Sequence, residues 1–292
     1  MTATLIDGAA IAAQVYDQLK LRVAALSDRG VRPGLAAIII GRDPASEIYL
    51  RNKTRACGDA GVHSELHRFD ADCAENEVME LIGRLNADAN IHGILVQMPL
   101  PLQFNSERIL HAIDPAKDVD GFSWENLGAL VAGQPRLCPC TPLGIMAMLD
   151  STGVVLDGIE AVVIGRSVTV GKPMALMLIA RGATVTVCNS KTRNLQDHTS
   201  RADLLVVAVG KAGVVNGGML KPGAIVIDVG INRLPDGKLA GDVDFASASR
   251  VASRITPVPG GVGRMTVAML ISNTVAAAEH TLSRAGSAAG QR

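Results

Sequence analysis

The chain has 292 residues, of which 48% are hydrophobic, so it can bury one large core or two medium ones without disulfide or metal staples. Its formal net charge of +0 and its aromatic content of 2% argue against a nucleic acid or an anionic membrane as partner. It has no apolar run of the roughly 20 residues that span a membrane, no basic leader typical of a signal peptide, and no CxxC pair among its five cysteines. We therefore expect a cytoplasmic protein with reduced thiols and no metal.

The first half of the sequence predicts alternating strands and helices. Residues 35–40 form a continuous apolar run, which is typical of a strand buried on both faces. The elements expected after it are a helix at about 45–60, a strand at 62–69, a helix at 75–87 and a strand at 93–96. Residues 114–142 are rich in proline, glycine and aspartate, so we expect mainly loop there, close to a domain boundary.

The second half repeats this pattern after a helix at about 142–151. The elements expected in it are strands at 160–164, 184–187, 204–208 and 224–229, with a helix at 172–180. Strands and helices in this order predict a parallel sheet with right-handed crossovers. A last helix is expected at about 265–283 and a disordered tail from residue 285.

The segment Gly165-Arg166-Ser167 lies between a predicted strand and a predicted helix, where a dinucleotide pyrophosphate binds. Its spacing to Gly171 is G-x-S-x-x-x-G rather than G-x-G-x-x-G, and by itself this also fits an ordinary turn.

The end of the next strand bears on the cofactor. Residues 188–193 read CNSKTR, with no acidic residue to bind the ribose hydroxyls of NAD. Basic and hydroxyl side chains suit the 2′-phosphate of NADP instead, and Arg166 could bind it in a bidentate manner. Lys191 and Arg193 also fit the commoner role of solvated loop charges. We therefore favour NADP over NAD.

Tyr49 and Lys53 are four residues apart, so a helix places them on one face. That face continues through the small residues Ala56, Cys57 and Ala60. A lysine in such a stripe is expected to be buried, which would lower its pKa as acid or base catalysis requires. A lysine that extends to solvent at the helix edge is the alternative.

The same Tyr-x-x-x-Lys spacing occurs in short-chain dehydrogenases, but there both residues follow the cofactor loop. Here they precede it by more than 110 positions, so we reject that family.

Three further segments could bind a ligand. Gln97 follows the strand at 93–96, and open α/β sheets bind ligands at this end of their strands. Asp118 and Asp120 of DVDG could accept hydrogen bonds from an aminopyrimidine, and residues 256–263 (TPVPGGVG) could let backbone approach a flat ligand. Each segment also has a purely structural explanation. Gln97 could hydrogen bond to the proline-rich loop behind it, the aspartates of DVDG could cap a turn, and residues 256–263 could be an ordinary loop.

Taken together, these segments resemble the bifunctional methylenetetrahydrofolate dehydrogenase/cyclohydrolase family, often called FolD. Eight matching segments occur in order from about residue 35 to 275: ASEIYLRNKTRACGDAGV, GILVQMPLP, DVDGF, PCTPLGIM, VVIGRSVTVGKPMA, ADLLVVAVGKAG, VIDVGIN and TPVPGGVG. The resemblance implies that NADP⁺ oxidises 5,10-methylenetetrahydrofolate to the methenyl cation, and that water then converts this cation to 10-formyltetrahydrofolate. It also implies a homodimer that pairs through its cofactor domains.

We therefore predict an α/β fold of two domains with a cleft between them. An N-terminal α/β catalytic domain, which binds the folate, is expected over residues 1–141 and is completed by the C-terminal helix at about 265–292. A Rossmann-like domain with a parallel sheet, which binds NADP, is expected over residues 142–264.

The resemblance also implies roles for individual residues. Lys53 would be the general acid/base of hydrolysis, tuned by Gln97, with Tyr49 stacking beside the substrate. The remaining substrate-binding residues would be Asp120, which grips the pterin, and Pro259, Gly260 and Gly261, which line the pocket. The cofactor-binding residues would be Gly165, Arg166, Ser167, Ser190 and Ile231, with Arg166 and Ser190 on the 2′-phosphate.

Two positions depart from the family pattern. Arg264 stands where PGGVGPMT has its second proline, and Asn189 stands where the family commonly has histidine. These departures keep two alternatives open: a dehydrogenase without cyclohydrolase activity, and a diverged folate- or nucleotide-binding protein without catalysis.

Overall fold

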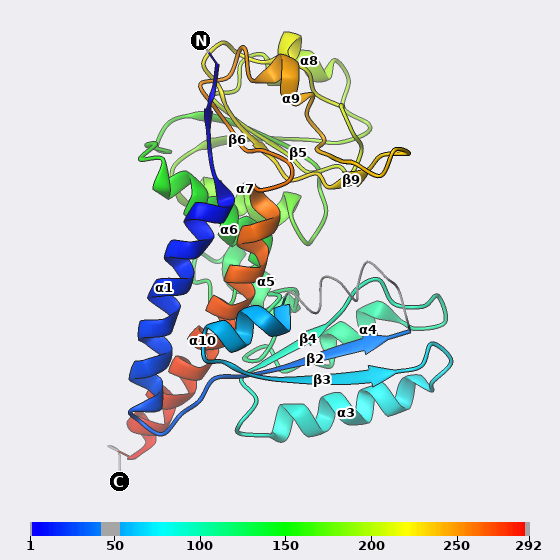
Figure 1. Ribbon diagram of the computed structural model, residues 1–292, viewed down its shortest axis with the longest axis vertical. Helices are drawn as coiled ribbons and strands as arrows, with labels where there is room; N and C mark the ends of the chain where they lie inside the picture. The colour runs from blue at the N-terminus through cyan, green and yellow to red at the C-terminus, as the bar shows by residue number, and fades with distance from the viewer. Residues whose placement is uncertain (1, 42–52, 290–292) are drawn as a thin grey trace. The chain divides into compact units, whose positions relative to one another are not determined.

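The computed structural model describes residues 2–41 and 53–289 (Figure 1). The chain forms two compact units. Unit 1 consists of Met1–Ala13 and Thr141–Thr266, and unit 2 of Gln14–Cys140 and Val267–Arg292. The helices α1 (Gly8–Ser27) and α10 (Val262–Ala289) contribute residues to both units. The catalytic and cofactor domain boundaries expected from the sequence stay a prediction.

Unit 1 contains a six-stranded sheet in which every described pair of neighbours is parallel. Its strands, in spatial order, are β1 (Thr4–Leu5), β11 (Arg254–Ile255), β8 (Ile225–Asp228), β7 (Leu204–Val207), β5 (Glu160–Ile164) and β6 (Thr184–Cys188). The central strands β7 and β8 are buried throughout, as the apolar runs of a sheet covered on both faces require. The core of this unit includes Val162, Leu205 and Val226.

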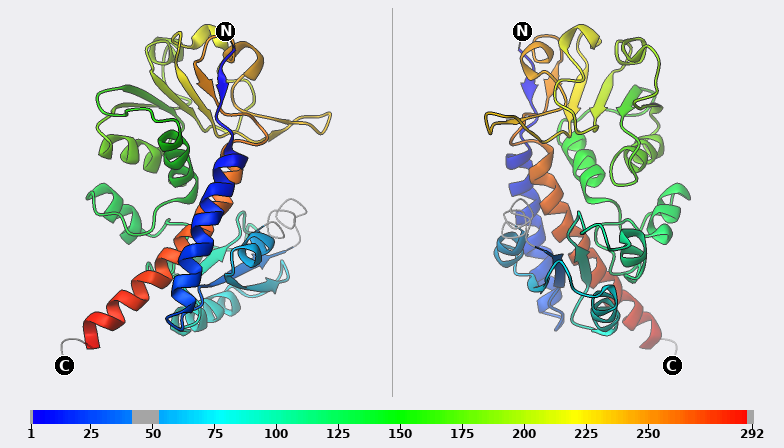
Figure 2. Two further views of the ribbon diagram at one scale, coloured as in Figure 1. Left: turned by 60° about the vertical axis from the view of Figure 1, so that its left-hand side comes forward. Right: turned by 90° about the vertical axis from the view of Figure 1, so that its right-hand side faces the viewer.

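Short helices and one hairpin complete unit 1. The helices are α6 (Cys140–Ser151), α7 (Gly171–Ala180), α8 (Leu195–Thr199), α9 (Phe245–Ala248) and the 3₁₀ turn η1 (Gly217–Met219). The antiparallel pair β9 (Asn232–Arg233) and β10 (Leu239–Ala240) projects from the unit as a hairpin, drawn in gold in Figure 2.

Unit 2 contains a three-stranded parallel sheet, β3 (His63–Phe69), β2 (Gly34–Ile40) and β4 (Gly93–Val96), in that order. Helix α3 (Glu75–Ala87) lies along it (Figure 1) and buries residues at i, i+3, i+4 and i+7: Val78, Leu81, Ile82 and Leu85. These side chains pack in one core with Ala36, Ile38 and Ile40 of β2. The described residues of this unit also form α4 (Ser106–His111), α5 (Trp124–Val131) and a helical segment at 53–59.

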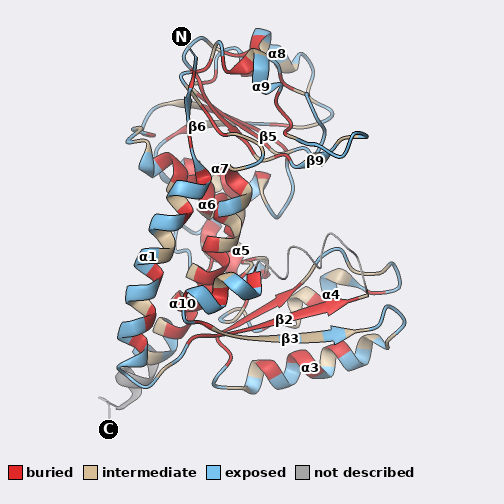
Figure 3. Cartoon of the chain, viewed as in Figure 1, coloured by how far each residue is buried: buried red, intermediate tan, exposed pale blue. Residues whose placement is uncertain are grey.

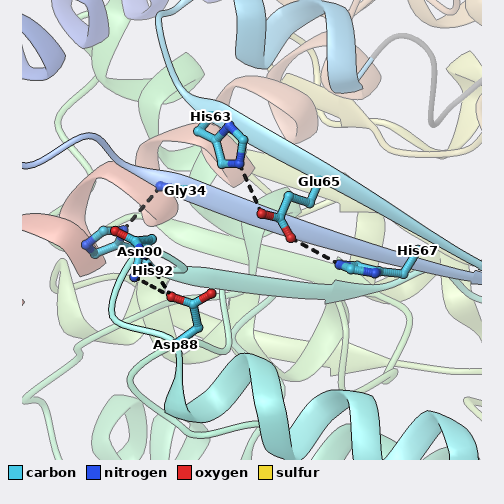
Figure 4. Close-up of polar contacts among 7 residues, drawn as sticks. All are labelled: Gly34, His63, Glu65, His67, Asp88, Asn90 and His92. Atoms are coloured by element: carbon cyan, nitrogen blue, oxygen red, sulfur yellow. Dashed lines mark hydrogen bonds and ion pairs between the residues drawn. The ribbon is translucent and has the colours of Figure 1, made fainter.

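The strands of this small sheet differ in burial. In Figure 3 β2 and β4 are buried along their whole length, whereas the edge strand β3 is intermediate to exposed. On β3 the carboxylate of Glu65 contacts the Nε2 atoms of His63 and His67 at 3.1 and 3.3 Å (Figure 4). Ionisable side chains of this kind discourage an open edge from pairing with another chain.

The structure confirms most predicted elements of the sheets. The strands at 93–96 and 160–164 and the helix at 75–87 have the expected bounds, and other strands differ by one or two residues. Two predictions were wrong: α5 lies in the segment expected to be mainly loop, and α10 continues to Ala289 instead of ending before a disordered tail. Among the described helices, none is long and apolar enough to cross a membrane.

Candidate active site

Lys53 is the first described residue of the helical segment 53–59 and is only 7% exposed. Cys57, one turn further on, is completely buried, as the stripe of small residues predicts. Arg55 and Asp59, on other faces of this helix, have side chains that are 85% and 70% exposed. The helix therefore turns Lys53 inward, and it does not extend to solvent at the helix edge. Tyr49 lies outside the described residues.

The amine of Lys53 meets the side chain of Gln97. Nζ of Lys53 donates to Oε1 of Gln97 at 3.2 Å, while Nε2 of Gln97 donates to the backbone oxygen of Met98 at 2.8 Å. Because the amide group is held at both ends, its oxygen faces the lysine. Gln97 itself is fixed by its backbone N–H, which donates to Ile38 of β2 at 2.9 Å. The sheet thus positions Gln97, and the helix positions Lys53.

Burial sets the charges around Lys53. It lowers the pKa of the Lys53 amine, while the neighbouring Asp120 carboxylate opposes that shift. Burial likewise raises the pKa of Asp120 to about 6, opposed by Lys53. The thiols of Cys57 and Cys140 lie close by, and burial raises the pKa of Cys57 to about 12 and that of Cys140 well above its usual value. Both thiols are therefore neutral, and among the described residues Asp120 is the carboxylate that raises the pKa of Lys53.

The two aspartates of DVDG have different surroundings. The carboxylate of Asp118 accepts hydrogen bonds from Gly121 N at 3.0 Å, Ser123 N at 2.7 Å and Asn126 Nδ2 at 3.0 Å. Asp118 therefore holds the loop, which is the capping role considered for this motif. No donor within the described residues hydrogen bonds to the carboxylate of Asp120, which leaves it available to a ligand.

One residue that supports this site could not be predicted from the sequence. Nδ2 of the buried Asn273, on α10, donates to the backbone oxygens of Val119 and Cys138, both at 2.8 Å. It thereby joins the segment that carries Asp120 to the segment that carries Cys140. A single asparagine within an apolar helix gives no indication of partners more than 130 positions away.

The turn after β5 is shaped by two glycines. Gly165 has φ +124°, and a Cβ there would collide with the carbonyl oxygen of Ala208. A Cβ on Gly171 would in turn collide with the carbonyl oxygen of Gly165. The Ser167 hydroxyl accepts from the N–H groups of Val170 at 3.1 Å and Gly171 at 3.4 Å, so it fixes the turn that leads into α7. This narrow turn at a helix N-terminus is the geometry that binds a pyrophosphate.

The other predicted cofactor residues lie at the same edge of the sheet. Arg166 follows β5, Ser190 follows β6 and Ile231 follows β8, and parallel strands bring their carboxyl ends to one edge. All three are exposed, Ile231 by 58%. Oδ1 of Asn189 accepts from Lys191 N at 2.9 Å and so closes the turn that carries Ser190.

The segment with Pro259, Gly260 and Gly261 belongs to unit 1. A Cβ on Gly8 would collide with the backbone oxygen of Gly261, so tight packing against the start of α1 explains part of the glycine content. Gly260 has φ +107°, which favours glycine, but a Cβ added there would meet no atom closer than Pro257 at 3.7 Å. The described residues contain no cluster of three or more His, Cys, Asp or Glu side chains that could hold a metal ion.

Two family models cover most of the chain. The catalytic domain of tetrahydrofolate dehydrogenase/cyclohydrolase matches residues 6–120, and the NAD(P)-binding domain of the same enzymes matches residues 139–282. The chain belongs to the tetrahydrofolate dehydrogenase/cyclohydrolase family. This confirms the resemblance found in the sequence, the α/β fold of two domains and the class of enzyme.

Individual relatives agree with the family models. The bifunctional protein FolD of Dechloromonas aromatica (strain RCB) is 61% identical over 279 residues, which cover 96% of this chain and 98% of that protein. The crystal structure of FolD from Campylobacter jejuni has a TM-score of 0.94 and 46% identity, covering 96% and 99% of the two chains. FolD from Trypanosoma brucei, solved with NADP and an inhibitor, has a TM-score of 0.92 and 37% identity, covering 97% and 99%.

Proposed function

We propose that Lys53 moves the proton in the second step of a two-step reaction on a folate. As a tetrahydrofolate dehydrogenase/cyclohydrolase, the chain oxidises 5,10-methylenetetrahydrofolate with NADP⁺ and hydrolyses the methenyl product to 10-formyltetrahydrofolate. The observation that carries the role of Lys53 is its buried amine, held by Gln97 and next to Asp120.

The first step needs NADP⁺ in a defined place. When bound, NADP⁺ takes a hydride from the methylene carbon between N5 and N10, which leaves the methenyl cation. The turn at Gly165 and Gly171 is too narrow for a Cβ at either glycine and leads into the N-terminus of α7, the kind of place where proteins bind a pyrophosphate. Arg166 and Ser190 bind the 2′-phosphate, Ser167 shapes the pyrophosphate turn, and Ile231 flanks the nicotinamide.

The second step needs a base that tolerates a cationic substrate. Burial lowers the pKa of Lys53, so a neutral amine is available to take a proton from the attacking water. The oxygen of that water forms a bond to the methenyl carbon as Lys53 takes its first proton. Lys53 then returns this proton to N5 as the bond from the carbon to N5 breaks. The remaining hydroxyl proton leaves to solvent as the formyl C=O forms, so the hydrolysis releases one proton overall. A permanently charged group such as arginine could not do this.

The same proposal assigns the remaining folate contacts. Asp120 accepts hydrogen bonds from the pterin edge, since its carboxylate has no donor of its own within the described residues. Tyr49 stacks beside the substrate, and Pro259, Gly260 and Gly261 line the pocket, as the resemblance implies.

A homodimer in the cytoplasm completes the proposal. The strand β6 pairs with β5 on one side, carries no charged residue and has Val187 42% exposed. An uncharged edge of this kind is suited to pairing with a second copy of the chain. The five free cysteines fit a reducing compartment. Light scattering should give the mass of a dimer, and Val187→Lys should lower it towards that of a monomer.

The function is tested by absorbance during turnover of 5,10-methylenetetrahydrofolate, with NADP⁺ and NAD⁺ supplied separately. We expect reduced nicotinamide to appear mainly with NADP⁺, and methenyl absorbance to rise and then decay to the formyl product. Reduction without decay of the methenyl compound would contradict the hydrolytic step, and no reduction with either nucleotide would contradict the whole assignment.

A further inference from the structure

Asp242 is a fully buried carboxylate that accepts four hydrogen bonds. Its Oδ2 accepts from the backbone N–H groups of Val209 at 2.7 Å and Gly210 at 2.9 Å. Its Oδ1 accepts from Lys211 N and from Asn232 Nδ2, both at 2.9 Å. Three consecutive backbone donors converge on one side chain, so its charge fixes the path of that loop.

The two segments that Asp242 joins lie at the edge proposed for the cofactor. Residues 209–211 follow β7, directly after Ala208, whose carbonyl oxygen leaves no room for a Cβ on Gly165. Asn232 follows Ile231, which is the residue proposed to flank the nicotinamide. A shift of either segment would therefore move residues that border the proposed cofactor site.

The surrounding residues hold Asp242 in place. A Cβ on Gly230 would collide with the Asp242 carboxylate, so glycine is required there to let the side chain pass. The neighbouring Asp228 accepts from the backbone N–H groups of Gly230, Asp242 and Val243, each at 2.9 Å. Asp228 thus orients the backbone of Asp242, and Asp242 orients the two loops.

We propose that Asp242 is a positioning residue for NADP⁺: through the loop at 209–211 and through Asn232 it sets the distance between the pyrophosphate turn and Ile231. Asparagine cannot replace it, because one end of the amide would present an N–H group to donors that need an acceptor. The inference rests on the proposed cofactor site at the carboxyl edge of the sheet.

The test is steady-state kinetics of Asp242→Asn. We expect its KM for NADP⁺ to rise at least tenfold, because the loss of a charged acceptor affects several hydrogen bonds at once. The KM for 5,10-methylenetetrahydrofolate and the hydrolysis of supplied methenyltetrahydrofolate without nucleotide should not change. The matched control is Asp203→Asn, which alters a carboxylate of the same sheet that accepts from Glu160 N and Lys221 Nζ before the start of β7. It should lower thermal stability and leave the KM for NADP⁺ unchanged.

An unchanged KM for NADP⁺ in folded Asp242→Asn would overturn the proposal, as would a parallel loss of both activities. If Asp242→Asn does not fold, Asn232→Ala decides: it removes one of the four donors and should raise this KM severalfold, and an unchanged KM again overturns the proposal. Failure of the proposed function is distinguishable, since the wild-type chain would then not reduce NADP⁺ at all.

Discussion

The two proposed sites of this chain differ in the groups that form them. Around Lys53 the site consists of side chains whose burial changes their pKa values, and Gln97 and Asp120 act on the amine directly. At the carboxyl edge of the large sheet the site consists mainly of backbone, shaped by Gly165 and Gly171, where any Cβ would collide.

This difference follows from what each site must do. Proton transfer needs a group that can both lose and regain a proton, and burial makes loss of the proton easier for a lysine. Recognition of a pyrophosphate needs several N–H groups at fixed positions, and backbone provides these without side-chain entropy. Substitutions should therefore affect chemistry at the first site and nucleotide binding at the second.

The largest expected effect is that of Lys53→Met. It should lower the rate of methenyl hydrolysis by about 10²- to 10⁴-fold, the usual contribution of a general acid or base. The melting temperature should stay the same or rise, because a buried lysine carries a desolvation cost that methionine does not. The decay of methenyl absorbance measures the rate.

The matched control is Arg55→Met, two residues along the same helix. Arg55 is exposed, with a long surface ion pair of 3.8 Å to Asp59, so hydrolysis should be unchanged. If Lys53→Met retains hydrolysis within tenfold of the wild type, Lys53 is not the acid/base.

Gly165→Ala tests the backbone site. The new Cβ meets the carbonyl oxygen of Ala208 and φ is +124°, so we expect a loss of stability of about 2–4 kcal/mol and a rise in the KM for NADP⁺ of tenfold or more. Gly213→Ala is the control, since its φ of +68° is also left-handed but nothing lies within 4 Å. It should cost about 1 kcal/mol, with no change in this KM. Equal KM values in the two variants would show that the close approach does not shape the cofactor site.

Asp120→Asn tests the electrostatic coupling at the first site. The Asp120 carboxylate raises the pKa of Lys53, so its removal lowers that pKa further. The neutral amine is the active form, and hydrolysis rises with pH through the lysine pKa, so this limb of the pH profile should move to lower pH.

The rate at saturating folate, measured from about pH 6 to 10, gives the position of this limb. Asp59→Asn is the control, because Asp59 is exposed on another face of the helix. A limb that stays in place, or moves to higher pH, contradicts the coupling.

The sequence predicts those parts of the fold that follow from local patterns. The continuous apolar runs of β2 and β5 and the helical period of α3 indicate buried elements without any knowledge of their partners. Helix α5 was missed among prolines and glycines, although Ser123, which caps it by accepting from Asn126 N, is a recognisable start signal. The two-residue strand β1 is too short to have a pattern.

The candidate sites were predictable to the extent that their residues lie in motifs. The burial of Lys53 follows from its stripe of small residues, but its hydrogen bond to Gln97 joins positions 44 residues apart. Asn273 and Asp242 give no local signal at all, because their roles consist mainly of hydrogen bonds to backbone elsewhere in the fold. Such partners become visible only when the chain is folded.

The smallest expected effect is that of Arg264→Pro, which restores the family residue. Arg264 is exposed in the first turn of α10, and its N–H donates to Gly261 O at a long 3.2 Å. Proline is tolerated there because first-turn N–H groups lack a helical partner. The change removes a cation from a helix N-terminus and reduces the freedom of the unfolded chain, so stability should change by less than about 1 kcal/mol, with any change upward.

Both activities of Arg264→Pro should stay within about threefold of the wild type, and Arg264→Ala separates the charge from the ring. If both variants gain tenfold in kcat/KM for the folate, the arginine charge hinders the site. If both lose tenfold, Arg264 binds an anionic part of a ligand. If only the proline variant differs, the fixed φ of the ring changes the neighbouring glycine segment, and the tolerance argued here for the first turn is wrong.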